Sequence, residues 1–153
     1  MKKSSKSPKP YTTEDKILIA AEPVGAYMRT PPSESQLHTL SRKGVPRRKV
    51  EHVADNLGLS IYDIAPLLHV SSRTLLRYSE NEPVDTPVSE HVLFLERLVA
   101  EGHSVFEHDE FITWLNSHVA ALDHKKPMEL LDTIFGIEMV RAVIGRVKYG
   151  VYS

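Results

Sequence analysis

The sequence predicts an all-α protein in which a helix-turn-helix module is followed by a second helical domain. Apolar residues recur at spacings of three and four in segment after segment, as they do on one face of a helix. No segment alternates between apolar and polar residues with the period of two that marks a half-buried strand. Two capping boxes also mark helix starts, one formed by Ser33 and Gln36 and the other by Ser60 and Asp63.

The N-terminal region divides into a basic arm and a set of helices. Residues 1–12 contain four Lys and no acidic residue, which predicts a disordered arm that either touches phosphate or serves only as a solubilising tail. A first helix is expected near Thr13, and Pro23 should interrupt it. We therefore expect residues 13–85 to form an N-terminal domain and residues 86–153 to form a second domain.

Two helices are expected between this region and the helix-turn-helix. The Ser33 capping box should open a helix that runs to about Lys43 and stops at Gly44. The next helix has Pro46 at its start, where a missing amide hydrogen is tolerated. Its apolar stripe, which should face the core, consists of Val50, Val53, Ala54 and Leu57.

Residues 59–80 have the spacing of a helix-turn-helix motif. Ser60 can cap the first helix, Ala65 stands where the two helices approach most closely, and Ser71 can cap the second helix. The positions that pack the two helices together carry Ile64, Leu68, Val70, Leu75 and Tyr78. In such motifs the second helix enters the major groove of DNA with its N-terminal residues towards the bases.

Two groups of residues are candidates for contacting DNA. On the second helix of the motif, Ser72 and Arg73 have the chemistry to read base edges, since Arg pairs bidentately with guanine. A basic run beside the preceding helix start has the charge to contact phosphates, which fix the register on the duplex. The residues assigned to DNA binding are Ser71, Ser72, Arg73 and Arg77 from the motif and Arg47, Arg48 and Lys49 from the basic run.

Two departures from the usual motif leave an alternative open. His69 stands in the turn, where many such motifs have Gly, and Pro66 lies inside the first helix. A proline there removes a backbone donor and clashes one turn back, so the first helix should be kinked or short. The motif would then serve only for packing or dimerisation, with Arg73 and Arg77 simply solvated.

The second domain should be built around its first helix. Residues 86–101 are apolar on most sides, which predicts a central helix that is buried all round. A helix capped by Asp109 should follow, with Trp114 in the core rather than on a partner-facing surface. Pro127 should then open a short helix that ends at Gly136.

The last helix is expected from Ile137 to Tyr149, closed by Gly150. One of its faces is apolar, and basic residues are spread over the rest of its surface. An apolar and aromatic tip, Val151-Tyr152-Ser153, then carries the carboxylate of the chain. A partly apolar terminus of this kind is suited to entering a pocket of another protein.

These C-terminal residues resemble the toxin-binding domain of the Xre/MbcA/ParS family of bacterial antitoxins. The resemblance rests on Pro127-Met-Glu-Leu-Leu-Asp-Thr133, on Gly136 and on a last helix that ends in Gly150-Val-Tyr-Ser153, and it extends from about Leu37 to Ser153. It implies an Xre-like helix-turn-helix followed by a helical toxin-binding domain. It also implies a partner, a RES-domain toxin that consumes NAD.

The resemblance further implies a mechanism in which the last helix and the tail cover the entrance to the active site of the toxin. The residues that it assigns to toxin binding are Arg141, Arg146, Lys148, Tyr149, Val151, Tyr152 and Ser153. The basic residues among them would meet acidic groups, while Tyr152 and the terminal carboxylate would go deepest.

The resemblance also implies a second function, which is DNA binding. The protein would bind operator DNA and repress its own operon as a homodimer within a larger toxin–antitoxin complex. The alternative, from another class, is a stand-alone Xre-like transcriptional regulator whose second domain only dimerises or senses a ligand.

Composition narrows the remaining chemistry. None of the 153 residues is Cys, so thiolate metal sites, disulfides and cysteine nucleophiles are excluded, in agreement with a reducing cytoplasm. The eight His match no zinc-ligand spacing, and no apolar run reaches the roughly 20 residues needed to span a membrane. Neither a Gly-rich phosphate loop nor a nucleophile elbow is present. We therefore expect a cytoplasmic protein that is not an enzyme, holds no metal or cofactor, and has no membrane partner.

Overall fold

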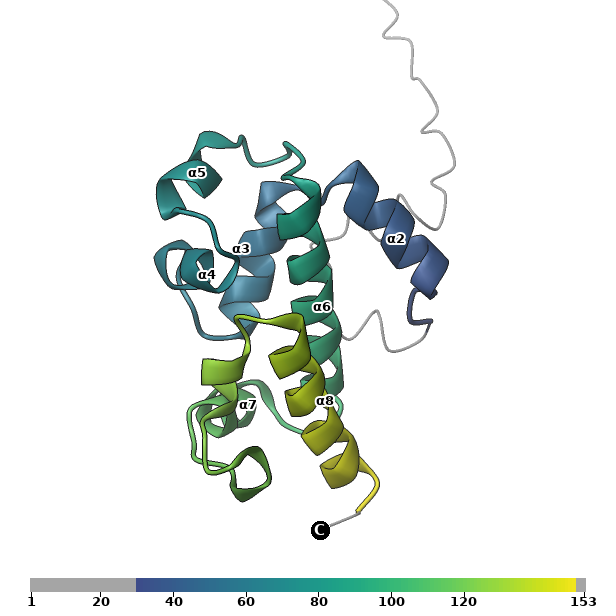
Figure 1. Cartoon of the computed structure of the whole chain (residues 1–153), viewed down its shortest axis with the longest axis vertical. Helices are drawn as coiled ribbons and strands as arrows, with labels where there is room; N and C mark the ends of the chain where they lie inside the picture. The colour runs from purple at the N-terminus through teal and green to yellow at the C-terminus, as the bar shows by residue number, and fades with distance from the viewer. Residues whose placement is uncertain (1–29, 151–153) are drawn as a thin grey trace, which may run out of the picture.

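A computed structural model describes residues 30–150, and within this range the protein consists of helices joined by turns (Figure 1). No strand is assigned there, so the all-α prediction is confirmed. The helices are α2 (Glu34–Lys43), α3 (Arg47–Asn56), α4 (Ile61–Leu67), α5 (Ser72–Arg77), α6 (Thr86–His103), α7 (His108–Leu115), the 3₁₀ turns η2 (Ala120–Leu122) and η3 (Pro127–Leu130), and α8 (Ile134–Lys148).

The helix α6 is the centre of the molecule. It packs against α2 and α3 along its upper half in Figure 1 and against α8 and α7 along its lower half. Val92, Leu95 and Leu98 on this helix are all 0% exposed, as predicted for a helix that is buried all round. One connected apolar core therefore runs from α2 to α8 through α6.

The two capping boxes form as the sequence predicts. Ser33 Oγ accepts from the amide of Gln36 at 3.2 Å, and the Gln36 side chain accepts from the amide of Ser33 at 2.8 Å. Ser60 and Asp63 make the same reciprocal pair at 3.2 and 3.1 Å, which fixes the start of α4. Each pair satisfies two amide groups that have no partner inside the helix.

The start of the last helix differs from the prediction. Pro127 opens only a 3₁₀ turn, and α8 begins at Ile134, three residues earlier than expected. Gly136 is not a helix stop: it lies inside the first turn of α8, where its amide donates to Oγ1 of the capping residue Thr133 at 3.0 Å. A Cβ at Gly136 would lie 1.8 Å from the carbonyl oxygen of Leu130. Close packing against Leu130 therefore requires glycine at this position. From the sequence alone, a glycine required by packing looks the same as a glycine that ends a helix.

Several expectations lie outside the described residues. They are the basic arm of residues 1–12, the helix near Thr13, and the tail residues Val151, Tyr152 and Ser153. The domain boundary between residues 85 and 86 stays a prediction.

Candidate functional site

The helix-turn-helix motif is formed by α4 and α5. Ile64, Leu68 and Leu75 are between 0 and 4% exposed and pack the two helices together. Ala65, at 1% exposed, lies among these core residues, as expected for the position of closest approach. Ser71 caps α5 by accepting from the amide of Thr74 at 3.0 Å.

The motif accommodates Pro66 inside α4 and His69 in the turn that follows. Pro66 lies one residue before the end of α4, which is only seven residues long. His69 takes the left-handed conformation, with φ of 58°, that a glycine would adopt in this turn. The turn therefore forms without Gly, and α5 follows it directly.

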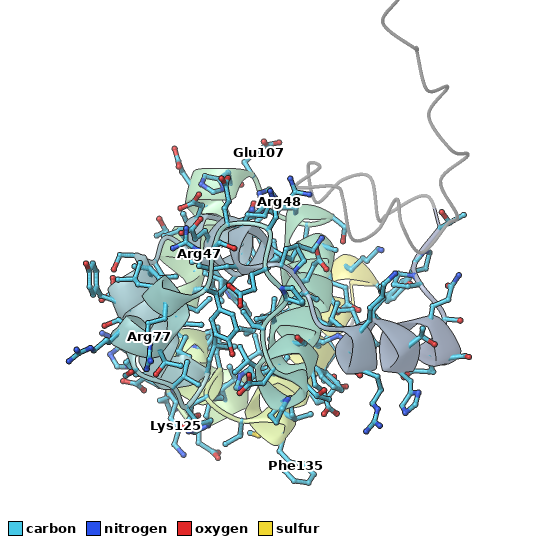
Figure 2. The ribbon with its side chains drawn as sticks, turned by 90° about the horizontal axis from the view of Figure 1, so that it is seen from above. Arg47, Arg48, Arg77, Glu107, Lys125 and Phe135 are labelled. Carbon is cyan, nitrogen blue, oxygen red and sulfur yellow. The ribbon has the colours of Figure 1, made fainter. Side chains whose placement is uncertain are left out.

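The outward side of α5 carries two of the residues that the sequence assigns to DNA binding. Arg73 and Arg77 are exposed, whereas Ser72 is half-buried and Ser71 Oγ is engaged in the cap. Figure 2 shows Arg77 on α5, away from the start of α3 where Arg47 and Arg48 lie.

The basic run at the start of α3, which the sequence assigns to phosphate contacts, is partly buried. Lys49 is only 2% exposed, and its Nζ lies 2.5 Å from Oε1 of Glu96 on α6. Its assignment to DNA binding is therefore wrong, because a buried ammonium paired with a carboxylate cannot reach a phosphate. Arg47 is half-buried and lies 3.6 Å from Glu51, and Arg48 is half-buried beside it.

The helix α8 has two apolar faces. The inner face packs on the core through Ile137, Val140 and Ile144, each 0% exposed. The opposite face carries a stripe that we call the outer stripe of α8, made of Phe135, Met139, Ala142 and Tyr149. These residues lie at spacings of four, three and seven, so they share one side of the helix.

The outer stripe is open to solvent. Phe135 is 86% exposed, Met139 45% and Tyr149 76%, and Figure 2 shows Phe135 projecting from the body of the molecule. Sequence reasoning assigned Tyr149 to this surface but missed Phe135 and Met139. Their signal was a pair of large apolar residues four apart on the side opposite the core-facing stripe.

Arg141 is engaged within the chain. Its Nη2 and Nε lie 2.5 and 3.0 Å from the two carboxylate oxygens of Glu101 on α6, and its Nη1 lies 2.7 Å from Glu138. Hydrogen bonds to Glu101 raise the pKa of the Arg141 guanidinium, against the opposing effect of burial. Its first role is to fix α8 on α6. Arg146 and Lys148 lie in the last turn of α8, where Arg146 is half-buried and Lys148 is exposed.

Two histidines hold the loop that leads into α8. His91 Nε2 on α6 lies 2.8 Å from the carbonyl oxygen of Leu131, and His69 Nε2 lies 2.6 Å from that of Asp132. Because a carbonyl oxygen only accepts, both rings donate from Nε2. Desolvation by burial lowers the pKa of His91, so the ring stays neutral near pH 7.

The described part of the chain was also compared with the requirements of a metal site and of a membrane-spanning helix. No group of three or more His, Asp or Glu side chains within residues 30–150 is placed to hold a metal ion. No helix in the same range is long and apolar enough to cross a membrane.

Comparisons with known proteins agree with this architecture. Residues 36–97 match a family model described as the antitoxin Xre-like helix-turn-helix domain, and residues 102–150 match one described as the antitoxin Xre/MbcA/ParS C-terminal toxin-binding domain. A relative named Antitoxin Xre, from Yersinia enterocolitica, is 32% identical over 87 residues, which cover 55% of this chain and 59% of the relative. The match thus spans less than two thirds of that protein. With both domains present in the same order, the chain belongs to the Xre/MbcA/ParS family of antitoxins.

Proposed function

We propose that this antitoxin neutralises a RES-domain, NAD-consuming toxin by covering the entrance to its active site with α8 and the tail that follows. The observation that carries the proposal is the outer stripe of α8, which lies within the segment that matches the toxin-binding domain. Aromatic and Met side chains are enriched at the centres of protein interfaces, and large exposed apolar groups in one row mark such surfaces. Phe135 is 86% exposed, so covering its side chain would remove more apolar surface from water than covering any other residue of the stripe.

The charges at the end of α8 complement this stripe. Arg146 and Lys148 lie in its last turn, where they would meet acidic groups at the rim of the toxin pocket. Arg141, held by Glu101 and Glu138, sets the position of the helix that presents them. The tail Val151-Tyr152-Ser153 would enter the pocket, with Tyr152 and the carboxylate deepest. The protein would act by occlusion in the cytoplasm, with no catalytic step of its own.

The second half of the proposal is repression of the antitoxin's own operon through α5. Arg73 and Arg77 are exposed on this helix and have the side-chain chemistry to pair with guanine, while Arg47 and Arg48 carry charge for phosphates. A homodimer would present two copies of α5 to half-sites about one helical turn of DNA apart, about 34 Å.

A crossed set of variants tests both halves at once. Phe135→Ala should weaken binding of the proposed partner, a RES-domain toxin, by about tenfold or more and leave promoter binding unchanged. Such a loss is about 1.4 kcal/mol, typical of a centrally placed interface aromatic. Arg73→Ala should lose about 1–3 kcal/mol of base discrimination and leave toxin binding unchanged. Tyr62→Ala, at a 65% exposed aromatic on α4, is the matched control for Phe135.

The readouts are growth rescue, co-purification with the toxin, and promoter titration at fixed salt. A wild-type chain that binds its promoter but neither binds nor silences the RES-domain protein would favour the stand-alone regulator instead. If Phe135→Ala and Tyr62→Ala weakened toxin binding equally, the outer stripe would not be part of the toxin interface.

A further inference from the structure

A short loop in the second domain, which we call the 118–126 loop after its residues, is closed by its own backbone. The amide of Val119 donates to the carbonyl oxygen of Lys125 at 3.1 Å, and the amide of His124 donates to that of Val119 at 3.0 Å. The side chain of Leu122 is 2% exposed and anchors the loop in the apolar core. The position of the loop is therefore fixed by the same core that holds the helices.

The 118–126 loop turns through two successive residues in the left-handed conformation. Asp123 and His124 have φ of 54° and 60°, in a region that residues with a Cβ seldom occupy. Backbone of this kind costs about 1–3 kcal/mol per residue and is concentrated at functional sites. Lys125, which follows the turn directly, is exposed. The loop is thus a candidate for binding a partner rather than a simple connection.

The charge of the 118–126 loop is mainly positive. It contains Lys125 and Lys126 and a single carboxylate, that of Asp123. Within residues 30–150 the ion pairs engage other cations, namely Arg47, Lys49, Arg97 and Arg141. Because no carboxylate in this range neutralises the ammonium group of Lys125, that group can serve an anionic partner.

The 118–126 loop lies on the same side of the molecule as α5. In Figure 1, α5 and the segment that joins α7 to α8 both lie to the left of α6. In Figure 2, Arg77 on α5 and Lys125 both lie on the left, while α2 projects to the right. The helix α7 also lies close to the motif, because a Cβ at Gly58 would be 3.0 Å from Cγ2 of Ile112. A DNA duplex that is bound by α5 and runs along this side would pass Lys125.

We propose that the 118–126 loop binds the sugar-phosphate backbone of the DNA beside the bases that α5 reads, with Lys125 as the contacting residue. The proposal rests on the operator binding proposed above and assigns part of the DNA contact to the second domain. A Lys ammonium is a compact point charge on a flexible stem, so it suits a phosphate and carries no sequence information. The contact adds affinity and lengthens the footprint on the DNA, whereas Arg73 sets the sequence preference.

The variant that isolates the contact is Lys125→Ala. It removes the ammonium group and keeps the backbone carbonyl that accepts from Val119, so the loop stays closed. Lys125→Gln keeps more of the side chain without its charge, and it replaces Lys125→Ala if circular dichroism shows that variant to be unfolded. Lys125→Arg should restore the contact, because it restores the charge. The matched control is Arg42→Ala, at an exposed cation on α2, the helix that projects on the opposite side.

The first measurement is the dissociation constant for a double-stranded fragment of the antitoxin's own promoter over a range of salt concentrations. Losing one phosphate contact should reduce the slope of log K against log salt by about 0.9, which corresponds to about fivefold weaker binding near 0.15 M salt. Lys125→Ala and Lys125→Gln should show this change, while Lys125→Arg and Arg42→Ala should keep the slope of the wild type. The preference for the promoter over a fragment with altered bases should stay unchanged, because no base contact is lost.

A second measurement locates the contact on the DNA. Hydroxyl-radical footprinting of the wild type should show backbone protection that extends beyond the major-groove site of α5 on one flank of each half-site. Lys125→Ala should lose this flanking protection and keep the rest of the footprint. Arg42→Ala should give the footprint of the wild type.

The outcomes separate this inference from the proposed function. A folded Lys125→Ala with the slope and footprint of the wild type overturns the inference and leaves the proposed function standing. If that variant instead weakened only the binding of the proposed RES-domain toxin, the loop would face an acidic surface of the toxin, and the inference would be wrong. Equal slope changes in Lys125→Ala and Arg42→Ala would reflect net charge alone and would overturn it as well. Failure of the wild type to bind its promoter overturns the proposed operator binding, and the inference falls with it.

Discussion

At the scale of single residues, basic side chains that the sequence marks for partners instead hold the protein's own helices together. Lys49 on α3 pairs with Glu96 on α6, and the two side chains are 2% and 4% exposed. Arg141 on α8 donates from Nε and Nη2 to the two carboxylate oxygens of Glu101, which is also on α6. The central helix thus anchors a neighbour on each side through a carboxylate.

The buried pair makes Lys49→Ala a stability variant rather than a DNA-binding variant. Removing the ammonium leaves the carboxylate of Glu96 without this partner in the core, at a cost of about 3–5 kcal/mol in the free energy of unfolding. The double variant Lys49→Met with Glu96→Leu should recover most of that loss, because it removes both charges. Urea denaturation gives the free energy of unfolding of the single and the double variant. A loss below about 1 kcal/mol for Lys49→Ala would contradict a structural role for the Lys49–Glu96 pair.

Burial of His91 makes the stability of the fold depend on pH. Desolvation lowers the pKa of this ring below its value of 6.5 in the unfolded chain, so the unfolded state binds the proton first. The free energy of unfolding should therefore be highest above pH 6.5 and decline as the pH falls below it. His103, whose pKa is also lowered by burial, contributes in the same direction.

The variant His91→Gln tests this attribution. An amide nitrogen can donate to the carbonyl oxygen of Leu131 in place of Nε2, and it does not titrate. Its unfolding free energy, measured by denaturant titration from pH 7.5 to pH 5, should fall less steeply than that of the wild type. Identical slopes for the two proteins would assign the pH dependence to other groups.

At the scale of elements, two glycines inside α8 have opposite surroundings. Gly136→Ala would place a methyl group 1.8 Å from a backbone oxygen of Leu130, which cannot move without disturbing η3, so the variant should unfold more easily. At Gly145 no atom lies within 4 Å of an added Cβ, so Gly145→Ala should stabilise the helix by up to about 1 kcal/mol. Thermal unfolding gives the melting temperatures of the two variants. If both melting temperatures shifted in the same direction, the predicted contrast between the two glycines would be wrong.

The elements also divide into those that the sequence specifies and those that it does not. Local signals predicted α2, α4 and α5 closely, because Ser33, Ser60 and Ser71 form caps within three residues of chain. The start of α8 was misplaced, because the role of Gly136 depends on the approach of η3, which is a tertiary contact.

The candidate site was predictable to a similar extent. Arg73 and Arg77 fell on the outer face of α5 because helical spacing alone determines that face. The burial of Lys49 and the bond from His69 to Asp132 were not predictable, since each requires a partner more than 40 positions away in the sequence. Phe135 was missed because the last helix was expected to begin at Ile137, so Phe135 fell outside it and could not be placed on the same helix face as Met139.

At the scale of the whole molecule, the DNA-reading motif and the toxin-binding segment share one core. The helix α6 packs on α2 and α3 along one half and on α8 along the other half, so it belongs to both parts of this core. A fragment of residues 86–153 would expose the α6 surface that α2 and α3 cover.

We therefore expect the fragment to be far less cooperative in thermal unfolding than the full chain, even where its helicity by circular dichroism is high. Its length of about 65 residues adds to this, because domains of that size bury little surface. A sharp unfolding transition, together with full binding of the toxin, would instead show that the toxin-binding domain is independent.

The shared α6 also constrains how such antitoxins exchange parts in evolution. The two family matches end at residue 97 and begin again at residue 102, so the junction between them falls inside one continuous helix rather than in a linker. A recombinant that joins the DNA-reading half of one relative to the toxin-binding half of another must keep the helical phase across these few residues. Its α6 must also fit against α2 and α3 from one relative and against α8 from the other. Operator preference and toxin preference should consequently be inherited together more often than their separate surfaces would require.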